Sequence, residues 1–460
     1  MGQLTDAVLS NATAAEIAAA PLPEEYFAAH LRVEDATMFE GVVDKDVRKS
    51  LRLGHVPMPE LAPDEVLVAV MASAVNYNTV WSAMFEPMSS FRYLKGLARQ
   101  GGWAKRHDQP FHVVGSDCAG VIVRTGSGVR RWEIGQHVVV SPAYVDDQEP
   151  TTHADGMLGA DQKAWGFETN FGALAEFTVV RATQLIPKPA HLTWEEAASV
   201  PLCAGTAYRM LVSERGANMK QGDVVLVWGA AGGLGGYAVQ YVRNGGGIPV
   251  AVVGSERKAE AMRRLGCEVI LNRTEIGIAD DIADDPKQVI RAGVRLGEMI
   301  NEQVGRAPDI VFEHIGRPTF GISVFVAQRG GTVVTCGSSA GYQHSFDNRY
   351  LWMRLKRIIG SHIANLQEYW DAHRLFELGH IVPTMSAVYP LADVAAACRL
   401  VQANQQIGKI AVRCLAPRAG LGVTDPELRE RIGEDRLNPW RGLTTGSDGA
   451  EFGGQRDDPA

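Results

Sequence analysis

The sequence has few cysteines and no apolar run long enough to cross a membrane. Its 460 residues include only six cysteines, and none forms a CxxC pair. This spacing excludes a disulfide framework and a clustered thiolate site for zinc, and it predicts reduced, mostly buried thiols. No apolar stretch approaches the roughly 18 residues of a membrane helix, and the first residues lack the features of a signal peptide. We therefore expect a cytoplasmic protein that does not bind a membrane.

Basic residues are also too few for a general binder of nucleic acid. The chain carries 45 Lys and Arg against 53 Asp and Glu, a formal net charge of −8. A nucleic-acid or anionic-membrane binder would need a basic face, so neither partner is expected. With 46% hydrophobic and 21% charged residues, the composition is that of an ordinary globular protein. The length predicts two or three domains.

Two different patterns of short apolar runs divide the chain. Between about 36 and 185, alternating or β-branched runs lie between Gly, Pro and Asp clusters, which predicts a β-rich, barrel-like region. After about 205, apolar strands at 224–228, 248–254, 267–272, 309–316 and 330–337 alternate with amphipathic segments, which predicts a doubly wound parallel sheet. We therefore predict an α/β protein with one domain over 1–204 and 366–460 and another over 205–365. The stretch 12–32 is predicted to form one or two short helices.

A glycine-rich turn follows the first strand of the predicted parallel sheet. The segment VVLVWGAAGGLGGYAVQYV places three glycines at three-residue spacing between a strand and a helix. Glycines let the turn approach a pyrophosphate closely, and the helix N-terminus supplies amide donors. The alternative is a structural turn, which the strand–helix context disfavours. The predicted cofactor-binding residues are Gly229, Gly232, Gly233, Leu234 and Gly235.

The end of the next strand predicts which dinucleotide binds. A site for NAD normally presents an acidic side chain here to the ribose 2′-hydroxyl. The sequence instead reads VVGSERK, which offers Ser255, Arg257 and Lys258 to a 2′-phosphate and favours NADPH. Two alternatives remain: Glu256 holds the ribose if the strand ends one residue later, and either cation alone belongs to a solvated helical turn.

Segments on both sides of the parallel sheet resemble the medium-chain dehydrogenase/reductase superfamily. These are PLCAGTAYRML at 201–211 and VYPLADVAAACRLVQANQQIGKIAV at 388–412. The resemblance implies a GroES-like β-rich substrate domain and a Rossmann domain. Where zinc alcohol dehydrogenases of that superfamily carry metal ligands, this chain offers Asn78, Ser116 and Asp117. Neutral amides and hydroxyls are poor zinc ligands. We therefore expect no metal, which suits hydride addition to an activated C=C bond.

Three further segments resemble crotonyl-CoA carboxylase/reductase: 76–87, 164–172 and 347–362. The resemblance implies a carbon dioxide site made of Asn78, Phe167, Glu168 and His362. In it the Asn78 amide and the Phe167 backbone N–H hold CO2, while Glu168 and His362 organise a water. Taken singly, these residues also fit structural roles: Asn78 as a turn residue, Glu168 as a salt-bridge partner and His362 as a strand-end histidine. Arg349 and Tyr350 are candidates for binding CoA, and the family implies a homotetramer built as a dimer of dimers.

The predicted function is NADPH-dependent reductive carboxylation of a 2-enoyl-CoA with CO2, which gives an alkylmalonyl-CoA. Small residues at Gly337, Ala340 and Ala160 predict room for a longer or branched acyl chain than crotonyl. One alternative is a zinc-independent enoyl-CoA or quinone reductase, in which a proton takes the place of CO2. Another is a non-catalytic NADPH-binding protein, because fold alone does not fix function.

Overall fold

The computed structural model describes residues 2–279 and 281–444, and the chain divides into two compact units. The first unit comprises Met1–Leu202, Asn365–His373 and Met385–Ala460, and the second comprises Cys203–Ala364 and Arg374–Thr384. Compared with the predicted division, the segment Arg374–Thr384 falls in the second unit instead of the first. Helices α6 (Pro201–Leu211) and α13 (Leu366–Glu377) contain residues of both units.

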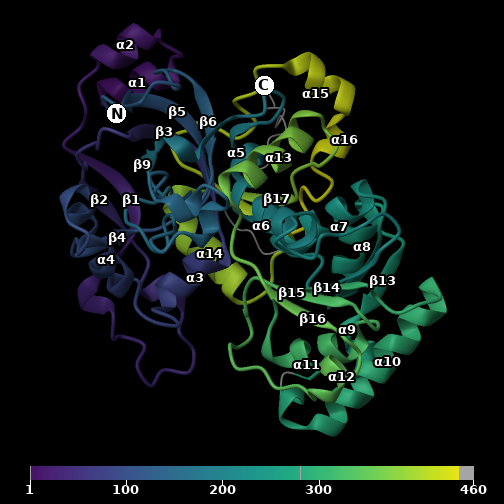
Figure 1. Ribbon diagram of the computed structural model, residues 1–460. Coiled ribbons are helices and arrows are strands. Elements are labelled where there is room, and N and C mark those ends of the chain that lie inside the picture. The colour runs from purple at the N-terminus through teal and green to yellow at the C-terminus, as the bar shows by residue number, and fades with distance from the viewer. Residues whose placement is uncertain (1, 280, 445–460) are drawn as a thin grey trace, which may run out of the picture. The chain divides into compact units, whose positions relative to one another are not determined.

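The first unit is built around a mostly antiparallel seven-stranded sheet (Figure 1). Its strands in spatial order are β10 (Leu185–Pro187), β6 (His137–Val140), β5 (Cys118–Thr125), β3 (Glu65–Ala74), β18 (Lys409–Arg413) and β17 (Met385–Pro390), with β9 (Phe177–Arg181) paired to β3. Strand β3 pairs with β5, β9 and β18, and all its residues are buried. This explains its continuous apolar sequence, EVLVAVMASA.

Smaller elements complete the first unit. A three-stranded sheet has the order β2 (Arg52–Pro57), β1 (Glu25–Arg32) and β4 (Phe111–Val113), and β7 (Ala143–Tyr144) pairs with β8 (Lys163–Ala164). The helices are α1 (Gln3–Leu9), α2 (Ala14–Ala19), α3 (Tyr77–Met84), α4 (Phe91–Ala98), α5 (Trp194–Ala198), α14 (Val394–Gln402), α15 (Pro426–Ile432) and α16 (Glu434–Leu437). The helical prediction for 12–32 is correct for α2 and wrong for 25–32, because pairing with β2 and β4 makes β1 a strand.

The second unit is a six-stranded parallel sheet flanked by helices, as predicted. The spatial order is β13 (Val269–Asn272), β12 (Ile248–Val253), β11 (Val224–Val227), β14 (Ile310–Glu313), β15 (Thr332–Thr335) and β16 (Arg357–Gly360). Its helices are α7 (Gly233–Asn244), α8 (Glu256–Arg264), α9 (Arg273–Ile276), α10 (Pro286–Val304), α11 (Arg317–Val326) and α12 (Arg349–Trp352). The chain order reverses between β11 and β14, and such switch points are where doubly wound sheets bind ligands at their carboxyl ends.

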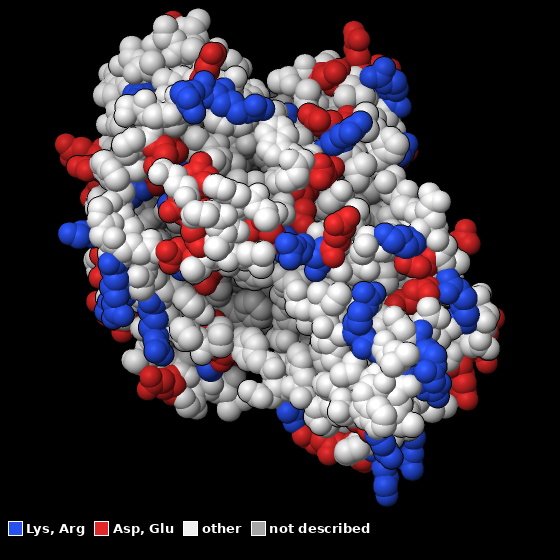
Figure 2. All heavy atoms as spheres, in the orientation of Figure 1, with Lys and Arg blue, Asp and Glu red and all other residues white. Residues whose placement is uncertain are grey.

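The surface charges and the burial of the cysteines can be compared with the predictions made from the composition. On the face drawn in Figure 2, acidic and basic side chains are interspersed and not gathered into areas of one sign. No helix within the described ranges is long and apolar enough to cross a membrane. None of the six cysteines, all of which lie within the described residues, forms a disulfide, and four of them are buried. Burial raises the pKa of the Cys398 thiol to about 12, so the reactive thiolate is scarce there.

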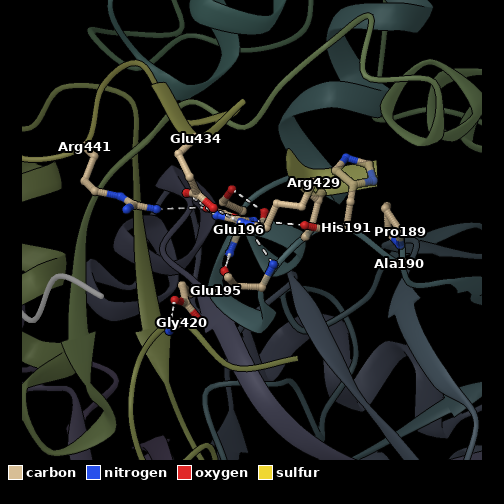
Figure 3. A network of polar contacts seen from close by, with 12 residues as sticks. Pro189, Ala190, His191, Glu195, Glu196, Gly420, Arg429, Glu434 and Arg441 are labelled. Atoms are coloured by element: carbon tan, nitrogen blue, oxygen red, sulfur yellow. Dashed lines mark hydrogen bonds and ion pairs between the residues drawn. The ribbon is translucent and has the colours of Figure 1, made fainter. Parts of the chain in front are cut away.

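The C-terminal segment after the last sheet strand folds back onto α5 of the first unit. Its anchor is the buried carboxylate of Glu196, which accepts from Arg429 Nη1 at 2.7 Å and from Arg441 Nη2 at 3.1 Å (Figure 3). Arg429 also pairs with Glu434, and both carboxylates raise the pKa of its guanidinium against the opposing effect of burial. The Gly420 N–H donates to Glu195 at 2.6 Å. This network attaches residues 418–444 to the fold.

We predict that Glu196→Gln weakens this attachment. The change removes the negative charge that Arg429 and Arg441 share, and breaking a buried ion pair typically costs about 3 kcal/mol or more. Thermal unfolding should begin several degrees lower, and trypsin should cut within 418–444 faster. The control is Glu430→Gln, the same change at an exposed position of α15. Equal unfolding temperatures and equal cleavage rates in the two variants would contradict this role.

Candidate active site

Asn78 lies in the first turn of α3, immediately after β3. Its Nδ2 donates to Ser116 Oγ at 2.9 Å, while its Oδ1 is buried and makes no hydrogen bond to any described residue. An amide NH2 carries two protons, so one remains after the bond to Ser116. The side chain is therefore fixed in orientation and still has a donor and an acceptor for a small polar guest.

A buried ion pair holds the start of α3. Lys409 Nζ, on β18, donates to Asp117 Oδ2 at 2.9 Å, to the Val75 carbonyl at 2.8 Å and to Asn76 Oδ1. Asn76 Nδ2 donates to the same Asp117 oxygen at 2.7 Å. The side chains of Lys409 and Asp117 are 2% and 0% exposed. All three ammonium protons therefore have acceptors, as a buried cation requires.

Asp117 of this pair is one of the three residues at the sequence positions where the resemblance to zinc alcohol dehydrogenases would place metal ligands. Asp117 gives one carboxylate oxygen to Lys409 and the other to the Leu202 N–H at 2.9 Å. In the part of the chain that the structure describes, no group of three or more His, Cys, Asp or Glu is placed to hold a metal ion. Metal independence stays a prediction.

Phe167 and Glu168 form a tight turn after β8. Glu168 Oε2 accepts from the Ala164 N–H at 2.8 Å, and the Ala164 carbonyl accepts from the N–H groups of Glu168 at 2.8 Å and Phe167 at 3.2 Å. The Phe167 N–H, which the resemblance assigns to CO2, therefore bonds within its own turn here. The bond from the Phe167 N–H is the longer and weaker of the two, because its length is at the upper limit for an N–H···O hydrogen bond.

A close backbone contact places this turn beside Asn78. Gly166 has φ +71°, and a Cβ on it would lie 2.0 Å from the carbonyl oxygen of Gly115. Only glycine fits such a position. Gly115 precedes Ser116, which accepts from Asn78, so three of the four predicted carbon dioxide residues share one frame in the first unit. His362 belongs to the second unit, where it is exposed two residues after β16.

The two predicted CoA residues lie in α12 of the second unit and differ in their surroundings. Arg349 is exposed and forms a two-bond ion pair with Asp347, with Nη2 at 2.6 Å and Nε at 3.0 Å from its oxygens. The ring of Tyr350 packs edge-on against Phe325, with centroids 4.6 Å apart. Tyr350 therefore has a packing role in this unit, and CoA binding by both residues stays a prediction.

The glycine turn has the shape that a dinucleotide needs. Gly232 is the N-cap of α7, so the first amides of this helix, at Gly233, Leu234 and Gly235, point outward without helical acceptors. A Cβ on Gly235 would lie 2.4 Å from the carbonyl oxygen of Gly229, so the helix packs against the strand end only with glycine there. These residues fit a pyrophosphate at the carboxyl end of β11.

The end of β12, which is expected to select the cofactor, has no acidic side chain in a position to bind a ribose hydroxyl. Strand β12 ends at Val253, and Ser255 is the N-cap of α8, accepting from the Lys258 N–H at 3.3 Å. Glu256 pairs with Arg263 at 2.7 Å, and 79% of its side chain is exposed. Glu256 is therefore directed along the outside of α8, which removes the observation that favoured NAD.

A third cation, Arg273, was missed by the sequence analysis. It begins α9 at the end of β13, the strand next to β12, and its Cδ would lie 3.7 Å from a Cβ on Gly254. Burial, together with the charges of Arg257 and Arg273, lowers the pKa of Lys258 to about 8. Three cations thus meet at one sheet edge. The adjacency of β12 and β13 is the signal that could have identified Arg273, because neighbouring parallel strands end at the same edge of a sheet.

Comparisons with known proteins agree with this geometry. Residues 62–190 match the family model "Alcohol dehydrogenase GroES-like domain" and residues 233–377 match "Zinc-binding dehydrogenase". The chain is 51% identical to a crotonyl-CoA reductase of Streptomyces avermitilis over 96% of this chain and all of that protein. It is 37% identical to a crotonyl-CoA carboxylase/reductase of Cereibacter sphaeroides over 81% and 86% of the two chains.

A solved structure gives a closer match. The 2-octenoyl-CoA carboxylase reductase CinF, in complex with NADP and 2-octenoyl-CoA, is 71% identical to this chain. The match covers 96% of this chain and all of the CinF chain, with a TM-score of 0.95.

We predict that binding of NADPH weakens as the pH rises through the pKa of Lys258. Between about pH 7 and pH 9 a 2′-phosphate is already a dianion, because its second pKa is about 6. Lys258, with a pKa of about 8, loses its proton over this range. The KM for NADPH should rise roughly tenfold, whereas the KM for NADH should stay constant. Lys258→Met should abolish the difference. A parallel rise for both cofactors, or an unchanged profile in Lys258→Met, would contradict the assignment.

Proposed function

The chain belongs to the crotonyl-CoA carboxylase/reductases of the medium-chain dehydrogenase/reductase superfamily, and we propose that it converts a medium-chain 2-enoyl-CoA and CO2 into an alkylmalonyl-CoA. NADPH, when bound at the Gly229–Gly235 turn, supplies the hydride that adds to the substrate's β-carbon. The α-carbon of the resulting thioester enolate attacks CO2 and forms the new C–C bond. The observation that carries the proposal is the frame that holds Asn78, Phe167 and Glu168 together.

In this proposal, Asn78 holds CO2 beside the α-carbon. Its orientation is set by Ser116, and its buried Oδ1 and second amide proton face no described partner. A pre-placed electrophile gains rate by proximity, because the enolate needs no encounter with dissolved CO2. The Phe167 ring excludes water, which would otherwise protonate the enolate. Glu168, with Oε2 bound to its own turn, and His362 of the second unit are proposed to organise one water at the other CO2 oxygen.

Replacement of Asn78 or His362 should change the product and not the hydride transfer. Asn78→Leu and His362→Asn each remove about 1–2 kcal/mol of CO2 binding. The reduced, uncarboxylated acyl-CoA should gain roughly five- to thirtyfold over the carboxylated product. Mass analysis of the products at fixed bicarbonate measures this ratio, with NADPH oxidation as the check on hydride transfer.

The matched control is His380→Asn, which makes the same change at an exposed histidine of the second unit. This variant should keep the same ratio of reduced to carboxylated product as the wild type. An unchanged carboxylated fraction in Asn78→Leu and His362→Asn would mean that the chain has the family's fold but holds CO2 elsewhere.

The proposed acyl substrate is a chain of about eight carbons. Support comes from the 71% identity to an enzyme described with 2-octenoyl-CoA. Gly337, half-buried after β15, and Ala340 and Ala160, both exposed, have side chains small enough to leave room for a longer acyl chain, which supports the proposal. Each methylene that a pocket buries contributes about 0.8 kcal/mol.

We predict that kcat/KM is at least about tenfold higher for 2-octenoyl-CoA than for crotonyl-CoA, because a pocket of that length gains contacts with four more methylenes. Gly337→Val should lower kcat/KM for the longer substrate more than for crotonyl-CoA. Steady-state rates with both substrates measure this. Equal values in the wild type would contradict the proposed chain length.

The proposal includes self-association through the second unit and a location in the cytoplasm. Strand β16 forms one edge of the parallel sheet, and exposed edges pair readily with a second copy. Large apolar side chains are exposed on and beside it: Trp352, Met353, Leu355 and Ile358. Pairing of this kind would give the dimer from which a tetramer is built. The proposal of a reducing compartment is supported by the six cysteines, none of which forms a disulfide.

A further inference from the structure

His112, on β4, connects the turn that carries Glu168 to the start of α4. The ring is fully buried; its Nε2 lies 3.1 Å from the Thr169 carbonyl oxygen and its Nδ1 lies 2.8 Å from Ser90 Oγ. A carbonyl only accepts, so Nε2 carries the proton and Nδ1 accepts from the Ser90 hydroxyl. Burial lowers the pKa of His112 to about 4, so this single arrangement persists at neutral pH.

Asn170 fixes the next residue of the same turn. Its N–H donates to His107 Nδ1 at 3.1 Å, and its Nδ2 donates to the Phe111 carbonyl at 2.8 Å. Its Oδ1 accepts from the Val113 N–H at 2.9 Å and from the following N–H at 2.8 Å. The two residues directly after Glu168 are therefore held by β4 and by His107 through side-chain and main-chain bonds, most of them buried.

Tyr93 meets the same turn from α4. Its ring centroid lies 5.7 Å from that of Phe167, with the planes tilted by 46°. Burial raises the pKa of the Tyr93 hydroxyl, and the nearby charge of Glu168 raises it further. The hydroxyl therefore stays protonated at neutral pH and lies within electrostatic range of the Glu168 carboxylate. Ser90 directly precedes α4, so its bond to His112 sets the position of the helix that carries Tyr93.

We propose that Ser90, His112 and Tyr93 are positioning residues that fix the Phe167–Glu168 turn and thereby set how the enolate divides between CO2 and a proton. The inference rests on the proposed function. None of the three residues needs to touch the substrate. A pocket for a molecule as small as CO2 tolerates displacements of only about half an ångström, and the rigidity of its supporting residues supplies that precision. If the turn shifts, CO2 loses contacts and water gains access.

The first test removes one buried hydroxyl. Ser90→Ala leaves His112 Nδ1 without its donor, whereas Ser90→Thr keeps it. We expect Ser90→Ala to raise the ratio of reduced to carboxylated product roughly three- to tenfold at fixed bicarbonate, with the KM for NADPH unchanged. Ser90→Thr should restore the wild-type ratio. Ser386→Ala is the matched control, because Ser386 is a buried serine of the same unit whose hydroxyl bonds elsewhere, to Ile407 and Thr444.

The second test separates the hydroxyl of Tyr93 from its ring. Tyr93→Phe keeps the contact with Phe167 and should shift the product ratio toward reduction by a few-fold; Tyr93→Ala removes the contact as well and should shift it further. Tyr26→Phe is the control, since the Tyr26 ring packs against Phe177 and not against Phe167. Circular dichroism and NADPH turnover confirm that each variant is folded.

The outcomes distinguish this inference from the function on which it rests. If the wild type forms only reduced product at every bicarbonate concentration, the proposed function fails. If the wild type carboxylates, and Ser90→Ala, Tyr93→Phe and Tyr93→Ala all keep its product ratio while folded, the positioning role is overturned and the function stands. A shift in Ser90→Ala that Ser90→Thr does not reverse also overturns the role, because the hydroxyl would then not be the cause.

Discussion

The buried ion pair between Lys409 and Asp117 is the interaction on which the proposed chemistry of the first unit depends. Lys409 arrives from the last strand of the sheet, and Asp117 lies just before β5. Through Asn76 they fix the start of α3, and through the chain they fix Ser116, the partner of Asn78. Either charge, buried here without its partner, would strongly destabilise the folded state. Together they form a rigid pair in which every proton of the Lys409 ammonium group has an acceptor.

The two units supply different parts of the chemistry. In the first unit, the contact between Gly115 and Gly166 joins the Asn78 side of the site to the Phe167–Glu168 turn, and the bonds of His112 and Asn170 hold that turn from its other end. In the second unit, the orphan amides of α7 and the three cations near β12 match the two anionic parts of NADPH. The proposed recognition of NADPH therefore depends on backbone geometry and charge.

The fold and the glycine turn were predictable because their signals are local. Apolar strands such as 224–228 and 248–254 became β11 and β12 almost to the residue. The errors arose where distant pairing decides. Residues 25–32 contain alanines that favour a helix, yet pairing with two strands makes them β1. Arg273 and His112 belong to no recognisable sequence motif. Each acquires its proposed role only through contact with a neighbouring strand or turn. The polar, Gly-rich sequence after Pro417 predicts that the last dozen residues are frayed, and these lie outside the described residues, which end at 444.

The most direct test of the central claim follows both new bonds in one reaction. The protein is supplied with deuterated NADPH, ¹³C-bicarbonate and 2-octenoyl-CoA, and the products are analysed by mass spectrometry and NMR. Reductive carboxylation predicts one molecule that carries deuterium on the β-carbon and ¹³C in a new carboxyl group on the α-carbon. A product with deuterium alone, at saturating bicarbonate, would contradict the account and identify a plain reductase.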